Sequence, residues 1–362
     1  MSFTVHVQLP YGLDATKTAQ EFRQGLCPDR VAYGFHHAEG LCETVTYSVD
    51  APEGWLESLL RKALFKALGF DVMHAWRNRE QIERADIVWT MLECDYLGVL
   101  LIFALRPWVT AKPVIAQNVW LFNDIARMGA IKRWLSMTLA ARAAVLTTHS
   151  RTYLGIMRHH LPRSDIRLMP FGISREVFSA KDVPAPADTD GPIRLFSAGN
   201  DRTRDWQTLF DAFGNDDRFR LTIVCDWVSD EALKTYRNLD LIRRPTMEQF
   251  RQLYRSADFA IVSMVENGYS GITVALESVA LGVPVVSSRT GGVPTYFNED
   301  EVLYASPGDP VDLREKVVSC SGQQRRDMAE RARQRFVACG YSTEEMIQRY
   351  ITLSREILAA PH

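Results

Sequence analysis

The sequence has no long apolar stretch and no cysteines at the spacing of a metal or redox motif. Its longest apolar run, residues 99–105, is much shorter than the roughly 20 residues that a membrane-spanning helix needs. The 6 cysteines border apolar segments, which indicates buried free thiols and a reducing compartment. The opening MSFTVHVQLP lacks a basic stretch before its apolar run and predicts a first strand, not a signal peptide. We therefore expect a cytoplasmic protein, soluble or peripheral on the inner face of the cell membrane.

Neither sign of charge dominates, and the nucleotide motifs of two enzyme classes are missing. The 42 Lys and Arg stand against 44 Asp and Glu, so the basic excess of a nucleic-acid-binding protein is absent. Up to Arg175 there are 20 basic and 16 acidic residues, and beyond it 22 basic and 28 acidic ones. This difference favours different partners for the two halves. No P-loop and no GxGxxG after a strand occurs, which argues against a kinase and a dehydrogenase.

Short β-rich apolar segments alternate with helical patterns along the chain. Strands that are apolar on both sides, separated by helices, predict parallel sheets covered by helices. We expect strands at residues 3–9, 43–48, 71–75, 86–91, 113–117, 144–148, 166–170, 193–198, 220–225, 239–243, 258–263, 283–288 and 302–305.

Between the two sets of strands, residues 179–192 are poor in apolar side chains and rich in Pro, Ala and Asp, which predicts an interdomain linker. We therefore expect an α/β fold of two doubly wound, Rossmann-like domains, over 1–178 and 193–340, that face each other across a cleft. Helical spacing predicts a last helix within 341–362.

The segment ENGYSGITVALESVALGVPVVSS, residues 266–288, joins a strand, a glycine-dotted loop and an apolar helix. In parallel sheets, ligands bind where such loops lead into helices, and the free N–H groups of the first turn suit a phosphate. Gly268 and Gly271 allow close approach of the backbone, while Ser270 and Thr273 add hydroxyl donors. Glu277, about one turn further along, suits the hydroxyls of a ribose. These features favour a nucleotide site, although a polar helix start with a solvated glutamate has the same spacing.

The longer string ALESVALGVPVVSSRTGGVPTYF resembles the nucleotide-sugar half of retaining glycosyltransferases of the GT-B fold, similar to family 4. The matching positions are Glu277, Gly282, Pro284, Val285, Val286, Gly291 and Gly292. The resemblance implies that Glu277 binds the ribose and that amides around Gly271, Ile272 and Thr273 hold phosphate or sugar hydroxyls. It also implies a UDP- or GDP-linked sugar as co-substrate, with no cofactor and no metal.

One position departs from this family. Where its motif has a first glutamate, Tyr269 stands in this sequence, and Glu266 lies three residues earlier. Either Glu266 or the backbone near Tyr269 meets the sugar, or this contact is absent.

Two further stretches match the family's donor half. In RLFSAGNDRTRDW, Gly199 matches the glycine at the end of the first strand, and Asn200 follows it. Arg202 and Arg204 are the cations available for the diphosphate, which guanidinium groups bind in a bidentate manner; an exposed Arg-rich turn is the alternative. The family places the base near 242–244, which includes Arg243.

The first half would bind the acceptor. Tyr11 and Gly12 lie where the family's first strand opens its cleft loop. Glu93 and Asp95 follow a strand in VWTMLECD, which resembles strings in bacterial exopolysaccharide glycosyltransferases, and a carboxylate there could accept or orient the acceptor proton. A helix N-terminal acid stabilised by the dipole is the alternative. We also place His74 at a strand end, as a sugar contact or a core histidine, and Asn118 and Trp120 beside the same cleft.

Two basic amphipathic segments, residues 54–70 and 130–137, could lie on an anionic membrane or cover a core. The family resemblance implies a lipid-linked saccharide acceptor and a last helix that crosses back to the first domain. The pairs His36–His37 and His159–His160 show no partner at metal-ligand spacing. Asp-x-Asp at 188–190 has a metal-binding form but falls in the linker.

The favoured activity is metal-independent, retaining transfer of a sugar to an acceptor hydroxyl. Arg202, Arg204 and a helix N-terminus would stabilise the leaving diphosphate, and Glu93 would orient the acceptor. Three alternatives stay open at this point: an inverting transferase with Glu93 or Asp95 as base, a nucleotide-sugar epimerase of the same fold, and an inactive nucleotide-binding partner protein.

Overall fold

The computed structural model describes residues 2–179 and 191–360, which form two compact units. Unit 1 combines the segments up to Gln24, from Asp29 to Pro170 and from Thr343 onward, whereas unit 2 comprises Gly25–Pro28 and Phe171–Ser342. The linker expected at 179–192, with its Asp-x-Asp string, lies outside the described residues except for 179, 191 and 192.

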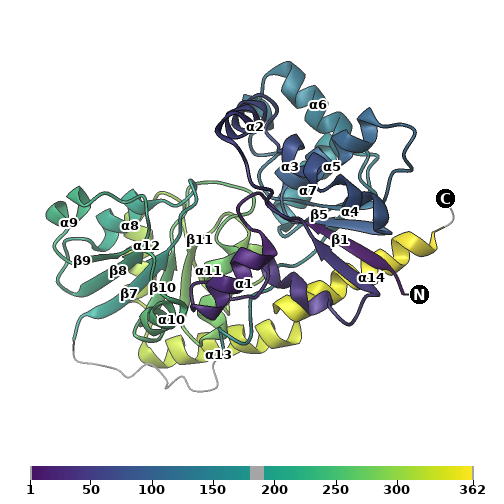
Figure 1. Cartoon of the computed structure of the whole chain (residues 1–362). Helices are drawn as coiled ribbons and strands as arrows, with labels where there is room; N and C mark the ends of the chain where they lie inside the picture. Colours follow the sequence, from purple (N-terminus) through teal and green to yellow (C-terminus); the bar gives the residue numbers. More distant parts are fainter. Residues whose placement is uncertain (1, 180–190, 361–362) are drawn as a thin grey trace. The chain divides into compact units, whose positions relative to one another are not determined.

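Unit 1 is built on a parallel sheet with the strand order β2-β1-β3-β4-β5-β6 (Figure 1). Its strands are β1 (Thr4–Gln8), β2 (Thr44–Tyr47), β3 (Ile87–Thr90), β4 (Val114–Asn118), β5 (Val145–Thr148) and β6 (Ile166–Leu168). Its helices are α1 (Ala15–Arg23), α2 (Trp55–Leu68), α3 (Val72–Arg77), α4 (Arg79–Arg84), α5 (Glu93–Leu105), α6 (Ala130–Ala140), α7 (Arg151–His160) and α14 (Thr343–Ala359), with 3-10 turns η1 (Ala32–Ala38) and η2 (Ile125–Arg127).

Unit 2 repeats this plan with the strand order β12-β11-β10-β7-β8-β9, again parallel throughout. Its strands are β7 (Ile193–Ala198), β8 (Phe219–Val224), β9 (Leu239–Ile242), β10 (Phe259–Val262), β11 (Val285–Ser288) and β12 (Leu303–Ala305). Its helices are α8 (Trp206–Phe213), α9 (Glu231–Thr235), α10 (Met247–Arg255), α11 (Ile272–Ala280), α12 (Pro310–Val318) and α13 (Gly322–Ala338), with the 3-10 turn η3 (Val293–Thr295).

The central strands are buried on both faces, as their continuous apolar sequences require. β3 and β10 are buried along their full length, and so are β4, β5 and β11. A parallel strand pair needs a crossover helix, so consecutive helices cover both faces of each sheet. The predicted α/β fold with two parallel sheets is confirmed.

One expected strand is wrong. Residues 71–75 form the start of helix α3, because Asp71 caps it by accepting a hydrogen bond from the backbone N–H of His74 at 2.9 Å. A side-chain cap of this kind satisfies one of the free donors of the first turn and stabilises a helix that the apolar pattern alone does not show. His74 therefore lies in a helix and not at a strand end.

Helix α14 belongs to unit 1 although it follows unit 2 in the sequence (Figure 1). The Trp89 indole N–H of β3 donates to Ser354 Oγ at 2.8 Å, and the Tyr350 hydroxyl donates to the Thr90 carbonyl at 3.2 Å. These buried bonds hold the carboxyl end of β3 just before Glu93.

Each sheet has a topological switch point, which lies between two neighbouring strands from which the chain continues toward opposite edges of the sheet. In unit 1 it lies between β1 and β3, and in unit 2 between β7 and β10. Crevices at switch points are the usual ligand sites of open parallel sheets. Tyr11, Gly12 and Glu93 follow the first pair of strands, and the loops 199–205 and 263–271 follow the second.

Within the described residues, no helix combines the length and the apolar character needed to cross a membrane.

Candidate active site

In unit 2, the loops after β7 and β10 are joined by backbone hydrogen bonds. The Asp205 N–H donates to the Ser263 carbonyl at 3.1 Å, and the Val265 N–H donates to the Thr203 carbonyl at 3.0 Å. An isolated antiparallel bridge pairs Arg204 with Met264. The two loops therefore form one surface at the switch point, and the Arg204 side chain lies against Gly199 at the end of β7.

Asn267 organises the loop that precedes α11. Its Oδ1 accepts hydrogen bonds from the N–H groups of Tyr269 and Ser270, at 3.0 and 2.7 Å. The chain then turns at Gly271, whose φ of +87° favours glycine, and α11 begins at Ile272 without a side-chain cap. No side chain among the described residues therefore caps the first turn of α11, where the helix dipole places partial positive charge.

Arg204 is a buried cation with only part of its hydrogen-bonding capacity used. Its Nε donates to Asp201 Oδ2 at 3.1 Å, and its side chain is 5% exposed. Within the described residues, its buried Nη1 has no hydrogen-bond partner. The guanidinium covers Gly199 so closely that a Cβ there would lie 2.2 Å from Nε. Glycine is therefore required at the end of β7 so that Arg204 can occupy this place.

Asp201 is the fixed counter-charge of Arg204. It accepts from the Thr203 N–H and hydroxyl at 2.9 and 2.5 Å. Burial acts to raise the pKa of Asp201, but the charge of Arg204 and hydrogen bonds from Thr203 and Ser270 outweigh it and lower that pKa. Asp201 therefore carries its negative charge at neutral pH.

In Glu277, the effect of burial on the pKa outweighs the interactions that lower it. This residue is buried in α11, and its Oε2 accepts a hydrogen bond from the Tyr254 hydroxyl at 2.7 Å. Burial raises the pKa of Glu277 to about 7, against the lowering effects of the Tyr254 hydrogen bond and the charge of Arg204. A buried carboxylate beside a cation and a free helix start is suited to accept hydrogen bonds from hydroxyl groups.

The structure brings part of the predicted donor set together. Gly199, Arg204, Ser270, Gly271, Ile272 and Glu277 surround the joined loops and the start of α11. Thr273 is in the same first turn and is exposed. Tyr269 is buried and Glu266 is exposed, so the two residues considered for the sugar contact have opposite environments.

Three further predicted donor residues have other contacts or a different exposure. Asn200 Oδ1 accepts from the Asp226 N–H at 2.8 Å and holds the loop after β8. Arg243 follows the edge strand β9 and donates to Asp230 and to the Val228 carbonyl. Arg202 is exposed, unlike Arg204, so the two arginines have different environments.

In unit 1, Glu93 begins α5 and holds the loop after β4. Its two carboxylate oxygens accept from the N–H groups of Val119 and Trp120, at 3.2 and 3.1 Å. Burial raises the pKa of Glu93, although these amide hydrogen bonds act to lower it. Glu93 and Trp120 line a common cavity of about 410 Å³, together with residues of α2, α5 and α6.

Asp95 stabilises the first turn of α5. It is buried, and its Oδ2 accepts from the Leu92 N–H at 3.1 Å within the first turn of α5. Burial raises the pKa of Asp95 well above its ordinary value. Of the two predicted carboxylates, Glu93 alone lines the cavity.

The other predicted acceptor residues lie in two different places: Tyr11, Gly12 and His74 near the end of β1, and Asn118 in β4. Tyr11 packs edge-on against His74, and the Gly12 N–H donates to Asp50 at 2.9 Å. His74 is a buried histidine whose Nε2 donates to the Leu9 carbonyl at 3.1 Å, and burial lowers its pKa. Asn118 is buried and accepts from the Tyr96 hydroxyl at 2.7 Å, so it does not line the cavity.

Two further features stand outside these groups. Ligand atoms of Asp29, His36 and His37 lie within 4.8 Å of one another, so the structure gives the first histidine pair a carboxylate neighbour that sequence spacing does not reveal.

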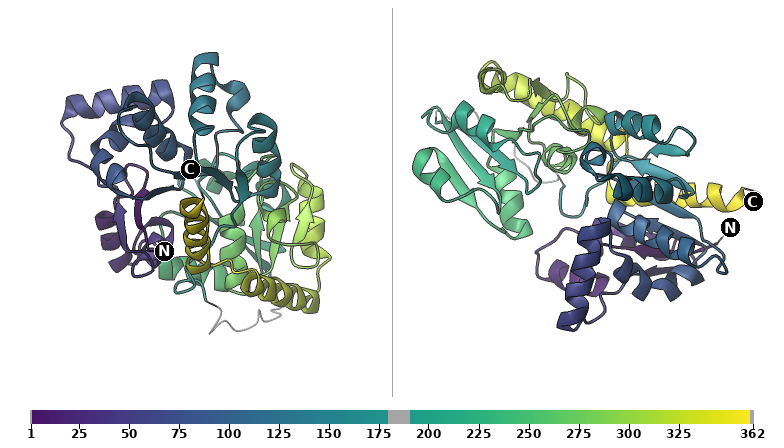
Figure 2. Two further views of the ribbon diagram at one scale, coloured as in Figure 1. Left: turned by 90° about the vertical axis from the view of Figure 1, so that its right-hand side faces the viewer. Right: turned by 90° about the horizontal axis from the view of Figure 1, so that it is seen from above.

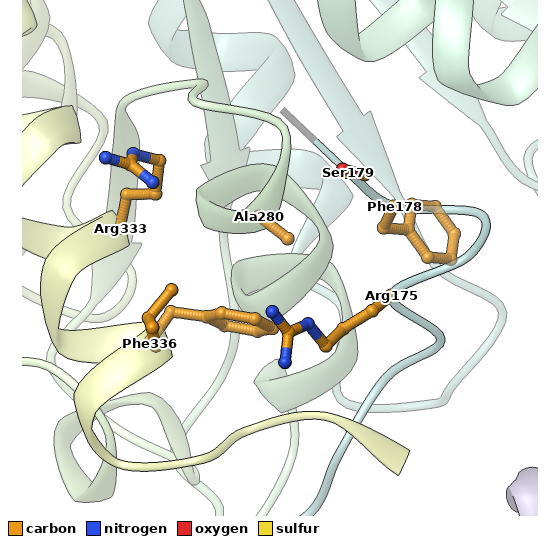
Figure 3. Close-up of a pocket in the computed structure, with 7 residues that line it drawn as sticks. Arg175, Phe178, Ser179, Ala280, Arg333 and Phe336 are labelled. Carbon is orange, nitrogen blue, oxygen red and sulfur yellow. The ribbon is translucent and has the colours of Figure 1, made fainter. Parts of the chain in front are cut away.

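In unit 2, a cavity of about 460 Å³ lies between Arg175 and Phe178 and the ends of α11 and α13 (Figure 3). No predicted donor residue lines it.

Sequence patterns do not identify Asp201, Tyr254 and Asn267 as site residues. The only local signals are an acid between Gly199 and the arginines and an Asn-Gly pair at 267–268. Tyr254 lies 23 residues before Glu277 and has no local signal.

Comparison with known proteins bears on this site directly. Residues 198–323, which lie within unit 2, match the family model of Glycosyl transferases group 1. Among curated proteins, none matches the chain in sequence.

Several solved structures share the fold over the whole chain. A sucrose-phosphate synthase from Thermosynechococcus elongatus is 17% identical, with a TM-score of 0.75 over 99% of this chain and 100% of that chain. HepE from Anabaena, in complex with UDP-glucose, is 12% identical, with a TM-score of 0.70 over 98% and 100%. An α,α-trehalose-6-phosphate synthase from Burkholderia multivorans is 13% identical, with a TM-score of 0.66 over 99% and 99%.

The family match confirms the prediction of a glycosyltransferase, and the solved structures confirm the GT-B fold. The matched segment contains Arg204, the loop 263–271 and Glu277.

The pKa of Glu277 is a testable property of this site. We expect its carboxyl carbon to titrate with a midpoint near pH 7 in ¹³C NMR, because burial disfavours the charged form. The Tyr254→Phe variant should titrate at a still higher pH, because it loses a hydrogen bond to the carboxylate. The signal is assigned by its absence in Glu277→Gln.

Tyr236→Phe, which also removes a tyrosine hydroxyl in unit 2, serves as the control and should leave the midpoint unchanged. A midpoint near pH 4.5 in the wild type would contradict the buried environment. Because the folded pKa is raised, the free energy of unfolding should fall as pH rises from about 4.5 to 7, by at most about 3 kcal/mol.

Proposed function

We propose that the chain transfers a sugar from a UDP- or GDP-linked sugar to an acceptor hydroxyl, without a metal and with retention of configuration. The observation that carries this proposal is the buried Arg204, whose Nη1 has no partner among the described residues, beside the uncapped start of α11 and Glu277. Such a group offers cationic and N–H donors to a diphosphate and a carboxylate to a ribose.

The donor would bind by charge and by hydroxyl contacts. The diphosphate would contact Arg204 and the first N–H groups of α11, with the exposed Arg202 as a second cation, and the ribose hydroxyls would donate to Glu277. The structure of HepE with UDP-glucose, which shares the fold, supports a nucleotide sugar as donor. Two guanidinium groups and a helix dipole can neutralise a leaving diphosphate, which supports the metal-independent form.

In the proposed reaction, the bond between the anomeric carbon and the diphosphate oxygen breaks, and the acceptor oxygen bonds to the same face of that carbon. The acceptor proton passes to an oxygen of the leaving diphosphate. This route needs no strong protein base, so Glu93 would orient the acceptor. Both Glu93 oxygens already accept an amide hydrogen bond, yet each carboxylate oxygen can accept a second one.

Nucleotide binding is the first test. UDP or GDP should raise the melting temperature, and Glu277→Ala and Arg204→Ala should each lose most of that shift. At a nucleotide concentration 100 times Kd, the stabilisation amounts to about 2.7 kcal/mol. Circular dichroism melts with UDP, GDP, ADP and dTDP at equal concentration measure it.

Glu231→Ala removes an exposed carboxylate of unit 2 and should keep the full shift. No shift with any nucleotide would refute the donor site. Consumption of the bound sugar donor without any acceptor would instead favour an epimerase, and an intact donor in all conditions would favour an inactive binding protein.

The role of Glu93 is testable through slow hydrolysis of the donor, with water as acceptor. We expect the sugar released from the bound nucleotide sugar to appear first in the donor's own anomeric configuration, as followed by ¹H NMR before it equilibrates. Glu93→Gln should slow the reaction by less than about 100-fold, because a general base contributes 10²–10⁴-fold.

Glu80→Gln, an exposed change in the same unit, is the control. Release of the opposite anomer, together with a loss of more than about 1,000-fold in Glu93→Gln, would replace retention by inversion with Glu93 as the base.

The acceptor is proposed to be a lipid-linked saccharide of bacterial surface or exopolysaccharide synthesis, reached at an anionic membrane surface. Helix α2 has no buried residue, and its Trp55 is 72% exposed, while Ile131 and Trp134 of α6 are 82% and 66% exposed. Both helices lie at the same end of unit 1 in Figure 1 and in the left view of Figure 2. Exposed apolar side chains beside Lys62, Lys66 and Arg133 suit the interface of an anionic bilayer.

Vesicle binding tests this surface. The protein should sediment with phosphatidylcholine–phosphatidylglycerol vesicles more than with phosphatidylcholine alone, and added salt should weaken the binding. Trp134→Ser should reduce the partition coefficient by about tenfold, because the indole loses its apolar contact with the interface. Trp227→Ser is the matched control, since Trp227 of unit 2 is 65% exposed. Equal losses in the two variants would refute the role of α6.

A further inference from the structure

In unit 1, the 3-10 segment η1 packs against the start of the last helix, α14. At Gly34, whose φ is +72°, an added Cβ would lie 2.6 Å from the Cβ of Thr343. The ring of Phe35, which follows, meets the ring of Tyr350 with 5.6 Å between the centroids. Two segments from opposite ends of the sequence are thus in close contact here.

Three groups that can bind a metal converge at this contact. The imidazole rings of His36 and His37 lie side by side, with centroids 4.1 Å apart. Asp29, which precedes η1, is buried, and one ligand atom from each of the three residues lies within 4.8 Å of the others. The cluster therefore offers two imidazole nitrogens and one carboxylate oxygen to a common point.

Two observations besides this convergence point to a ligand. The Nδ1 atom of His36 is buried and has no hydrogen-bond partner within the described part of the chain. A buried polar atom without a partner is rare in native structures and often marks a bound ion or water. On the other side of the cluster, His37 Nε2 lies 4.0 Å from Glu344 Oε1 of α14. The nearby cation, Arg30, is paired with Glu39, so its charge is offset locally.

The donor atoms select the class of metal. Imidazole nitrogen and carboxylate oxygen are ordinary ligands of Zn²⁺, whereas Mg²⁺ and Ca²⁺ prefer oxygen atoms alone. In a tetrahedral site with bonds of about 2.0–2.2 Å, the ligand atoms lie about 3.4 Å apart. Rotation of the side chains is sufficient to bring atoms that lie within 4.8 Å of one another to this separation.

We propose that Zn²⁺ binds at this cluster and links η1 to the first turn of α14. Its ligands are the side chains of Asp29, His36, His37 and Glu344. The ion stabilises the docking of α14, the helix whose buried hydrogen bonds hold the carboxyl end of β3. None of the four ligands belongs to the candidate donor group or lines the cavity beside Glu93. The site is therefore structural, and the inference goes beyond the proposed sugar transfer and does not depend on it.

Titration calorimetry with ZnCl₂ on the full chain, without an affinity tag and after treatment with a chelator, tests this site. We expect one Zn²⁺ per chain, bound at least 100-fold more tightly than Mg²⁺ or Ca²⁺. The double variant His36→Ala/His37→Ala should weaken the binding at least 100-fold. Asp29→Asn and Glu344→Gln, which preserve side-chain size, should each weaken it at least tenfold, because each removes a charged ligand.

The matched control is His159→Ala/His160→Ala, which removes the other consecutive histidine pair of unit 1. Its rings lie 5.3 Å apart, and among the residues that the structure describes it belongs to no such cluster. This variant should bind Zn²⁺ as the wild type does. Equal losses in the two double variants would overturn the site and leave adventitious metal binding only. A loss of the same size in Cys339→Ser, which removes an exposed thiol, would do so as well.

Hydrogen exchange tests the link between the two segments. Zn²⁺ should slow amide exchange in η1 and in the first turns of α14 by at least threefold, while α7 should be unaffected. Glu344→Gln should lose the slowing in α14. Unchanged Zn²⁺ affinity in Glu344→Gln, or equal slowing in α7, would overturn the link.

Discussion

The candidate donor site depends on the burial of one cation. A guanidinium that leaves water needs charge and hydrogen-bond partners in return, and Asp201 supplies a carboxylate at 3.1 Å that remains ionised. Gly199 leaves the space in which the group lies, and the bridge to Met264 fixes the backbone of Arg204. With Nη1 unpaired within the described residues, the compensation is incomplete. An anion at this point would complete it, so the cost of burying Arg204 favours ligand binding.

Glu277 makes the same site sensitive to its ligand. With a pKa of about 7, the carboxyl is divided between its protonated and charged forms at neutral pH. Hydroxyl donors stabilise the charged form, whereas a phosphate next to Arg204 weakens the field that favours it. A nucleotide brings both groups at once, and their balance sets whether a proton is released or taken up on binding. In unit 1, Glu93 has a related arrangement, since the effect of burial on its pKa is offset in part by two backbone amides and by the start of α5.

The fold was more predictable from the sequence than the site was. The apolar run at residues 258–263 predicts a buried strand correctly, whereas 71–75 has a similar pattern and is helical with Asp71 as its cap. In the site, Glu277 was predicted from its place one turn into a helix, and Gly199 from its match to the family's glycine at a strand end. The difference between Arg202 and Arg204 does not follow from the sequence, because it is set by contacts with the loop after β10. Tyr254 cannot be identified from the sequence either, because its partner Glu277 lies 23 residues further along the chain.

The attachment of α2 explains why its apolar face stays open. An isolated helix of 14 residues is marginal in water, and α2 has no buried residue to stabilise it. Its anchor is polar: Arg61 bonds Glu53 at 2.7 Å and Asp71 at 2.9 Å, and it covers the ring of Tyr11. These contacts use the side of the helix that carries Arg61 and require no apolar burial. Trp55, Leu56, Leu59 and Leu60 of this helix are each more than half exposed, so they add little to the stability of unit 1 as described, and their exposure is consistent with a surface that is covered only in a complex or at a membrane.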